Sequence, residues 1–166
     1  MPTLHLTCGL PGAGKTTLAR QLESRHSALR LTKDEWLLHL FSDDITAARN
    51  GDYRDRMERE LTDLALRALE LGVDVVLDFG LWHRREREEL RTRASAVGAR
   101  SELHFLDVPL DELVARLALR NREQPAGTFR ITEAQLRFWA TLFEAPTPDE
   151  LAPRDPPSRR QMPAPR

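Results

Sequence analysis

A glycine-rich motif near the N-terminus constrains this chain most: Gly9-Leu10-Pro11-Gly12-Ala13-Gly14-Lys15-Thr16. The glycines, followed by lysine and threonine, match a phosphate-binding loop that joins a strand to a helix. In such a loop, backbone N–H groups and the helix dipole surround the phosphates, the lysine reaches the β- and γ-phosphates, and the threonine hydroxyl coordinates Mg²⁺. We therefore expect ATP and Mg²⁺ as cofactors, with nucleotide contacts from Gly9, Pro11, Gly12, Ala13, Gly14, Lys15, Thr16 and Thr17.

Strand-like and helical segments alternate along the rest of the chain. Strand-like runs occupy residues 3–7, 28–31, 73–77 and 102–106. Helical patterns occupy residues 15–25, 52–71, 83–97 and 132–144, and further helices begin near Thr32 and after Pro109. This alternation predicts an α/β fold in which helices cover both faces of a parallel sheet and ligands bind at the carboxyl ends of its strands.

The length of the chain and the distribution of proline define the expected domain. A chain of 166 residues with 40% hydrophobic side chains fits one domain with a single core. Residues 121–131, rich in Arg, Asn, Gln, Pro and Gly, are expected to form a lid. Residues 146–166 contain 7 of the 11 prolines, so we expect a disordered tail behind a domain of residues 1–145.

Charge and cysteine content restrict the partners and the compartment. A formal net charge of −1 gives no overall field that would attract nucleic acid or an anionic membrane. The single cysteine, Cys8, cannot form an internal disulfide, and the start of the chain lacks the basic and apolar segments of a secretory signal. We expect a cytoplasmic protein, monomeric or homodimeric, without a membrane span.

Two aspartates follow predicted strands. Asp34 lies where a carboxylate can face the γ-phosphate and accept the proton of an acceptor hydroxyl; alternatively, it is a first-turn acid that the helix dipole favours. Asp78 ends an apolar strand and is suited to hold Mg²⁺, directly or through water, beside Thr16. Its alternative role is to cap the loop that follows.

Arginines occur in two helical stripes. In the first, Arg116 faces Glu112 and is assigned a structural role, whereas Arg120, at the start of the lid, is assigned to the nucleotide and to the transferring phosphoryl group. The second stripe, at positions 84, 87 and 91, alternates with glutamates, which is typical of a solvated face. Arg84 lies nearest the strand ends and is a substrate candidate. The five histidines show no metal-ligand spacing and are assigned no chemistry.

The glycine-rich loop alone does not separate a kinase from a GTPase or a motor. The guanine-selecting sequence Asn-Lys-x-Asp does not occur, and a single domain offers no second body that could transmit mechanical work. A small-molecule kinase with Lys15, Asp34 and Arg120 as its catalytic residues is therefore the leading class.

Four segments of the chain resemble a known group of P-loop kinases. They are residues 9–20, 33–36 (Lys-Asp-Glu-Trp), 77–82 (Leu-Asp-Phe-Gly-Leu-Trp) and 106–116. The group includes the 5′-kinase domain of polynucleotide kinases, zeta toxins and chloramphenicol phosphotransferases, and the resemblance covers about residues 3–145. It implies a P-loop NTPase fold of the kinase type with sheet order 2-3-1-4, with Asp34 activating the acceptor hydroxyl and Arg120 as the lid arginine.

Two departures from that group bear on the acceptor and on the sheet. Polynucleotide kinases carry an arginine one helical turn after the aspartate, and here the position is Leu37. The fifth strand that is usual in these folds is not evident. The sheet therefore has four strands, or the tail supplies a short edge strand.

Together, these patterns favour an ATP-dependent phosphotransferase that acts on a small hydroxylated acceptor. Trp36 and Leu37 follow Asp34 and are expected to line the acceptor pocket, and Arg84 is expected to contact the substrate. Two alternatives stay open. One is a polynucleotide 5′-hydroxyl kinase, and the other is a P-loop ATP-binding or ATPase regulatory module in which Asp34 only begins a helix.

Overall fold

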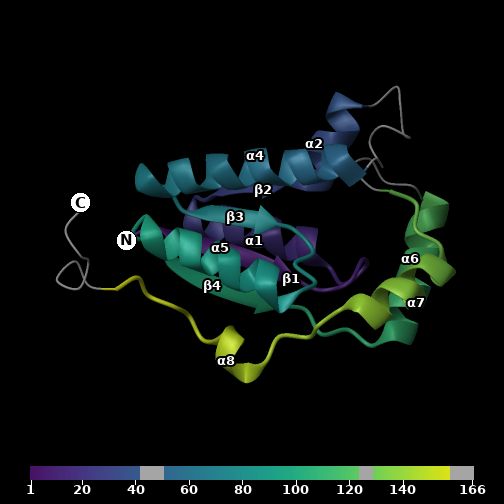
Figure 1. Cartoon of the computed structure of the whole chain (residues 1–166). Coiled ribbons are helices and arrows are strands. Elements are labelled where there is room, and N and C mark those ends of the chain that lie inside the picture. The colour runs from purple at the N-terminus through teal and green to yellow at the C-terminus, as the bar shows by residue number, and fades with distance from the viewer. Residues whose placement is uncertain (42–50, 124–128, 158–166) are drawn as a thin grey trace.

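The protein is described by a computed structural model for residues 1–41, 51–123 and 129–157. Four strands form one parallel sheet: β1 (Thr3–Cys8), β2 (Leu29–Thr32), β3 (Val75–Asp78) and β4 (Arg100–Phe105). Their order is β2-β3-β1-β4, so β3 and β1 lie in the middle of the sheet (Figure 1). The predicted α/β class and sheet order are confirmed.

The central strands are rich in apolar residues because both of their faces are covered. All four residues of β3 are buried, and so is every residue of β1 except Thr3. In a parallel sheet with helices on both faces, such strands need apolar runs rather than an alternating pattern. The register pairs Leu4 with Val75 and Leu6 with Leu77, which brings these side chains together in the largest hydrophobic cluster.

Helices pack on both faces of the sheet. On one face lies α1 (Lys15–His26), whose Ala19 and Leu22 cluster with Val76 of β3. The main hydrophobic cluster on the other face includes residues of α4 (Gly51–Glu70) and α5 (Arg84–Ala96). The short helix α2 (Lys33–Leu40) follows β2 directly and contacts α4. Among the described residues, no helix combines the length and the apolar character that crossing a membrane requires.

Two further helices lie beyond the carboxyl ends of the strands, α6 (Leu110–Glu123) and α7 (Glu133–Leu142) (Figure 1). Leu113 and Leu117 of α6 pack with Leu136 of α7 and with Ala13 of the glycine-rich loop. The predicted capping pair begins α7, because the Thr132 hydroxyl accepts a hydrogen bond from the backbone N–H of Gln135 at 3.2 Å. This pair of helices therefore packs directly on the loop that is expected to hold phosphate.

The first part of the tail is ordered, contrary to the prediction. Pro148–Leu151 form the short helix α8, and the chain then runs back along β4 (Figure 1). The backbones of Ser101 and Arg154 exchange two hydrogen bonds of 2.9 Å, an antiparallel bridge at the edge of the sheet. This bridge stands where a fifth strand was considered, and the sheet itself has four strands. Residues 158–166 of the predicted tail lie outside the described part of the chain.

A buried ion pair, which the sequence pattern did not predict, holds the ordered part of the tail against the domain. Arg87 of α5 is fully buried, and its Nε and Nη2 donate to the two carboxylate oxygens of Glu150 at 2.7 and 3.0 Å. These hydrogen bonds, before any other cause, lower the pKa of Glu150. Arg91 is also buried and donates to the backbone carbonyls of Glu150 and Ala152.

The predicted solvated arginine stripe on α5 is therefore wrong for Arg87 and Arg91. We call Arg87, Arg91 and Glu150 the α5–tail seam. A guanidinium can be buried when carboxylate and carbonyl oxygens satisfy its donors, and here the tail brings those oxygens to α5.

Candidate functional site

The glycine-rich loop occupies the turn between β1 and α1, as the motif requires. Gly12 has a φ of +87° and Gly14 a φ of +100°, a backbone region that side-chain-bearing residues rarely adopt. A Cβ atom on Gly12 would also lie 3.2 Å from Cγ of Leu117, so α6 leaves no room for one. These two glycines allow the chain to enter α1 with its first N–H groups at the carboxyl edge of the sheet, where a helix N-terminus favours an anion.

Lys15, the first residue of α1, is a partly buried cation beside carboxylates. Its Nζ donates to the carbonyl of Leu10 at 2.9 Å. Burial lowers the pKa of Lys15, and the charges of Asp78 and Asp34 oppose that shift. The lysine thus lies at the end of the loop with both predicted aspartates in its electrostatic environment.

Asp78 ends β3 and is buried next to hydroxyl groups. Thr32 donates to its Oδ2 at 3.1 Å, and the Thr7 hydroxyl lies 3.5 Å from its Oδ1. Burial raises the pKa of Asp78, while a hydrogen bond from Thr16 and the charge of Lys15 oppose the rise. A buried carboxylate and the neighbouring Thr16 hydroxyl offer the hard oxygen atoms that Mg²⁺ prefers, so these residues fit the expected metal.

Asp34 lies in the first turn of α2 and is paired with a residue that the sequence analysis did not single out. Arg54, near the start of α4, donates from Nη2 to the Asp34 Oδ1 at 2.8 Å. The Arg54 guanidinium also lies 5.4 Å from the centroid of the Phe129 ring, in the lid segment. No local motif marks Arg54, because the fold alone brings α2, α4 and the lid segment together.

Arg120 of α6 is held at the same edge. Its Nη2 donates to the carbonyl of Phe129 at 3.2 Å, whereas its Nε is buried and has no hydrogen-bond partner among the residues that the structure describes. Burial lowers the pKa of Arg120, and the charge of Asp34 opposes that shift. We use the name nucleotide edge for the group Lys15, Thr16, Asp34, Asp78 and Arg120.

The two ends of the predicted lid, residues 121–131, are joined by one side chain. Nδ2 of Asn121 donates to the Ile131 carbonyl at 2.6 Å, and the Ile131 N–H donates to Oδ1 of Asn121 at 3.2 Å. Residues 124–128 of the lid lie outside the described residues. Both bonds fix where the segment leaves α6 and where it rejoins the chain before α7.

Two further predicted residues, Arg116 and Arg84, have different surroundings. Arg116 bonds Glu112 at 2.5 Å, which confirms the predicted pair, and its Nη1 also lies 3.4 Å from the carbonyl of Gly12. Arg84 donates to Thr147 at 3.0 Å and to Asp149 at 2.7 Å, so its guanidinium is bound to the tail. The assignment of Arg84 to the substrate is therefore corrected.

The two apolar residues predicted to line the acceptor pocket differ in their exposure to solvent. Leu37 has no exposed surface, because it lies on the side of α2 that faces the core. It cannot contact an acceptor, and this prediction is wrong. Trp36, by contrast, exposes 42% of its surface and stays a candidate.

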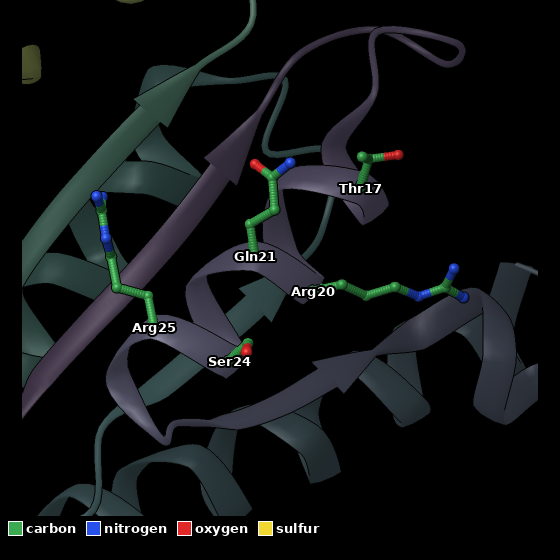
Figure 2. Close-up of a pocket in the computed structure, with 5 residues that line it drawn as sticks. All are labelled: Thr17, Arg20, Gln21, Ser24 and Arg25. Atoms are coloured by element: carbon green, nitrogen blue, oxygen red, sulfur yellow. The ribbon is translucent and has the colours of Figure 1, made fainter.

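A shallow hollow lies on the outer face of α1, separate from the nucleotide edge. Figure 2 shows the side chains that line it, which come from this one helix: Thr17, Arg20, Gln21, Ser24 and Arg25. Arg20 bonds Glu35 at 3.2 Å. Thr17 is thus exposed on the far side of the helix start, although its position next to Thr16 follows the predicted motif.

The sheet order, the glycine-rich loop between β1 and α1, and the buried aspartate at the end of β3 define a P-loop nucleotide-binding protein of the kinase type. The chain belongs to the AAA domain family, whose model matches residues 4–146. No curated protein matches the sequence.

Solved structures with the same fold support the resemblance to P-loop kinases. The chain is 22% identical, with a TM-score of 0.69, to a protein of the Pnkp1/Rnl/Hen1 RNA repair complex, and covers 93% of itself and 48% of that chain. It is 18% identical (TM-score 0.61) to a gluconokinase from Sinorhizobium meliloti 1021, covering 89% of itself and 78% of that chain. It is 22% identical (TM-score 0.56) to the Mycobacterium tuberculosis APS kinase CysC in complex with AMPPNP and APS, covering 74% and 75%. The chain thus spans about half of the RNA repair protein and about three quarters of the two kinases.

Proposed function

We propose that the protein is an ATP-dependent kinase that transfers the γ-phosphoryl group to a hydroxyl of a small-molecule acceptor. The observation that carries this proposal is the position of Asp34. Its charge acts on both Lys15 and Arg120, so one carboxylate lies in the same electrostatic environment as the two cations expected at the phosphates. A helix-capping acid alone would not need either cation nearby.

The groups of the nucleotide edge divide the work of phosphoryl transfer. Lys15 and Arg120 neutralise charge on the phosphate oxygens, and the N-terminus of α1 adds its N–H groups. Thr16 and Asp78 would hold Mg²⁺, which supplies further neutralisation of the phosphate charge. The nucleotide is thereby positioned with its γ-phosphate towards Asp34.

Asp34 serves as the general base. Its carboxylate takes the proton of the acceptor hydroxyl while the acceptor oxygen forms a bond to the γ-phosphorus. The bond between that phosphorus and the bridging oxygen breaks, and ADP leaves with the electron pair. Arg54 orients the carboxylate through Oδ1. The acceptor therefore approaches from the side of Oδ2.

A small acceptor is supported by the surroundings of Asp34. The exposed ring of Trp36 offers an apolar wall two residues away, whereas the position one turn on is the buried Leu37 rather than a cation. A nucleic-acid backbone needs several cationic contacts, and the net charge of −1 does not provide them overall. Two of the proteins with this fold are a gluconokinase and an APS kinase.

A second candidate is a polynucleotide 5′-hydroxyl kinase. It is favoured by Arg54, which places a cation at Asp34 from another helix, and by the fold shared with a protein of an RNA repair complex. The two candidates differ in how salt affects catalysis, because every phosphate contact adds to the salt dependence of nucleic-acid binding.

The test is a phosphorylation screen with γ-labelled ATP, Mg²⁺ and a library of hydroxylated small molecules, alongside a 5′-hydroxyl oligonucleotide. We expect at least one small molecule to gain the mass of a phosphoryl group, with little transfer to the oligonucleotide at moderate salt. Efficient labelling of the oligonucleotide that falls steeply with added salt would favour the second candidate. Release of free phosphate without dependence on any acceptor would contradict both and indicate an ATPase.

A further inference from the structure

A cluster of histidines and carboxylates lies on the face of the sheet that α1 covers. His5 of β1 is opposite Glu102 of β4 in the strand register, and Thr7 is opposite His104. Because residues two apart in a strand share a face, His5, Glu102 and His104 all project to the same side. Sequence spacing gave no sign of this group, since His5 and His104 are 99 positions apart.

The donor atoms of these three residues are close enough together to surround one metal ion. Nδ1 of His5 lies 3.1 Å from Nε2 of His104 and 3.8 Å from Oε2 of Glu102, and the ligand atoms of all three lie within 4.8 Å of one another. Around a tetrahedral Zn²⁺ with bonds of about 2.0–2.1 Å, donor atoms are about 3.3 Å apart. The two separations from His5 Nδ1 are therefore within about half an ångström of the tetrahedral value.

His5 is arranged as a metal ligand rather than as an ordinary core residue. It exposes only 1% of its surface, and its Nε2 has no hydrogen-bond partner in the described part of the chain. An imidazole nitrogen is the commonest protein ligand for transition metals.

A carboxylate near the His5 ring can give the support that ligating histidines usually have. Asp74 and His26 bring ligand atoms within 4.8 Å of a His5 ring nitrogen. A metal on Nδ1 fixes the hydrogen on Nε2, and ligating histidines commonly donate that second N–H to a carboxylate, directly or through water. Asp74, whose Oδ1 also accepts the Thr3 N–H at 2.8 Å, is close enough to act as this second-sphere acceptor through water.

We propose that His5, His104 and Glu102 bind one divalent transition-metal ion of the Zn²⁺ type, with Asp74 orienting His5. Two imidazoles and a carboxylate suit Zn²⁺ and leave one position for water. The site is distinct from the expected Mg²⁺ site, because its ligands come from β1 and β4, whereas Thr16 and Asp78 lie on α1 and at the end of β3. The ion would cross-link the edge strand β4 and the central strand β1.

The test uses the full chain, treated with a chelator and then titrated with Co²⁺ and Zn²⁺. We expect one equivalent of Co²⁺ to give the visible absorption of a tetrahedral site, Zn²⁺ to displace it, and millimolar Mg²⁺ to leave it unchanged. Zn²⁺ should also raise the Tm, because it binds the native state. Absence of both the cobalt spectrum and the Tm shift overturns the proposal.

Variants locate the site. His104→Ala and Glu102→Gln should each lower the affinity for Zn²⁺ by at least tenfold, and Asp74→Asn by about tenfold, the lower end of what second-sphere partners contribute. The matched control is His39→Ala, which removes an exposed histidine of α2 and should leave the affinity unchanged. If His104→Ala does not fold, the affinity of Glu102→Gln for Zn²⁺ tests the assigned ligands by itself. Full affinity in Glu102→Gln, or a loss in His39→Ala, would contradict the assigned ligands.

Discussion

The nucleotide edge and the α5–tail seam both bury charged groups, but among the described residues only the seam supplies hydrogen-bond partners for every nitrogen of its buried Arg87. In the seam, Arg87 uses Nε and Nη2 for Glu150 and Nη1 for the carbonyls of Leu81 and Glu144. At the edge, Lys15 Nζ donates to the Leu10 carbonyl, and Arg120 Nε is unpartnered among the described residues.

This difference separates architectural charge from functional charge. A buried cation costs free energy unless oxygen atoms take up its hydrogen bonds. The seam supplies those atoms from the protein, so its role is to hold the tail against α5. The edge has cations with unused capacity next to a helix N-terminus, which is the arrangement an incoming phosphate would complete. Changes in the seam should therefore affect stability, and changes at the edge should affect nucleotide binding and transfer.

The largest expected effect on stability comes from the seam. Arg87→Met should lower the free energy of unfolding by about 3–5 kcal/mol, because it leaves the Glu150 carboxylate buried without its partner. ATP affinity of the folded variant should be unchanged. Urea denaturation monitored by circular dichroism gives the first quantity, and calorimetry gives the second.

Two variants control this prediction. Arg84→Met removes a neighbouring arginine whose pair with Asp149 is exposed, and it should cost about 0–1 kcal/mol. The double variant Arg87→Met with Glu150→Leu removes both charges and should recover most of the lost stability. Equal losses of unfolding free energy in Arg84→Met and Arg87→Met would show that the buried pair stabilises the protein no more than the exposed one.

At the nucleotide edge, Asp34→Asn should lower phosphoryl transfer to the acceptor by about 10²-fold or more, the range of a lost general base. The amide keeps the shape of the side chain, so the Tm and the affinity for Mg·ATP should stay near those of the unaltered protein. Single-turnover kinetics with labelled ATP measure the effect. A transfer rate within a few-fold of that of the unaltered protein would mean that Asp34 is only a first-turn acid of α2 and not the general base.

The smallest effect is a dependence of the seam on pH. The pKa of Glu150 is lowered below its ordinary value of 4.5, first by the hydrogen bonds from Arg87, so the native state binds the proton less readily than the unfolded state. The stabilisation is fully present above about pH 4.5 and is lost as the pH falls through the lower native pKa.

Glu150→Gln removes this titration and serves as the comparison. The unaltered protein should be more stable than Glu150→Gln by about 2 kcal/mol at pH 7, and the difference should shrink as the pH falls below 4.5. Denaturation curves between pH 3 and pH 7 measure it. A difference that stays constant over this range would mean that the ion pair does not set the acid stability.

The sequence predicted what depends on contiguous residues and missed what depends on tertiary contacts. The loop from Gly9 to Thr16 can be recognised from consecutive residues of the sequence. Asp78 can be placed because it follows a run of apolar residues that predicts a strand. Arg54 and His104 carry no local signal, because their partners, Asp34 and His5, lie on other elements. Helix and strand patterns place residues on faces but do not say which distant segment covers each face.

The error over the tail has the same cause. Proline-rich composition predicted disorder in the tail, and the arginine–glutamate alternation of α5 predicted a solvated face. In the structure, the tail covers the arginines of α5, and these arginines hold the tail in place. Glu150 takes up the donors of Arg87, and Arg91 holds the carbonyls that follow. Neither pattern alone contains this pairing, which joins residues 63 positions apart.

The most direct test of the account is the affinity of Lys15→Ala for Mg·ATP, measured by calorimetry on protein shown to be folded. In the proposed role, Lys15 contacts the phosphates, and a charge-assisted contact contributes about 1.5–3 kcal/mol, so the affinity should fall by about 10–100-fold with little change in Tm. Arg87→Met, its counterpart in the seam, should bind Mg·ATP as the unaltered protein does. Unchanged affinity in folded Lys15→Ala would contradict the assignment of the nucleotide edge.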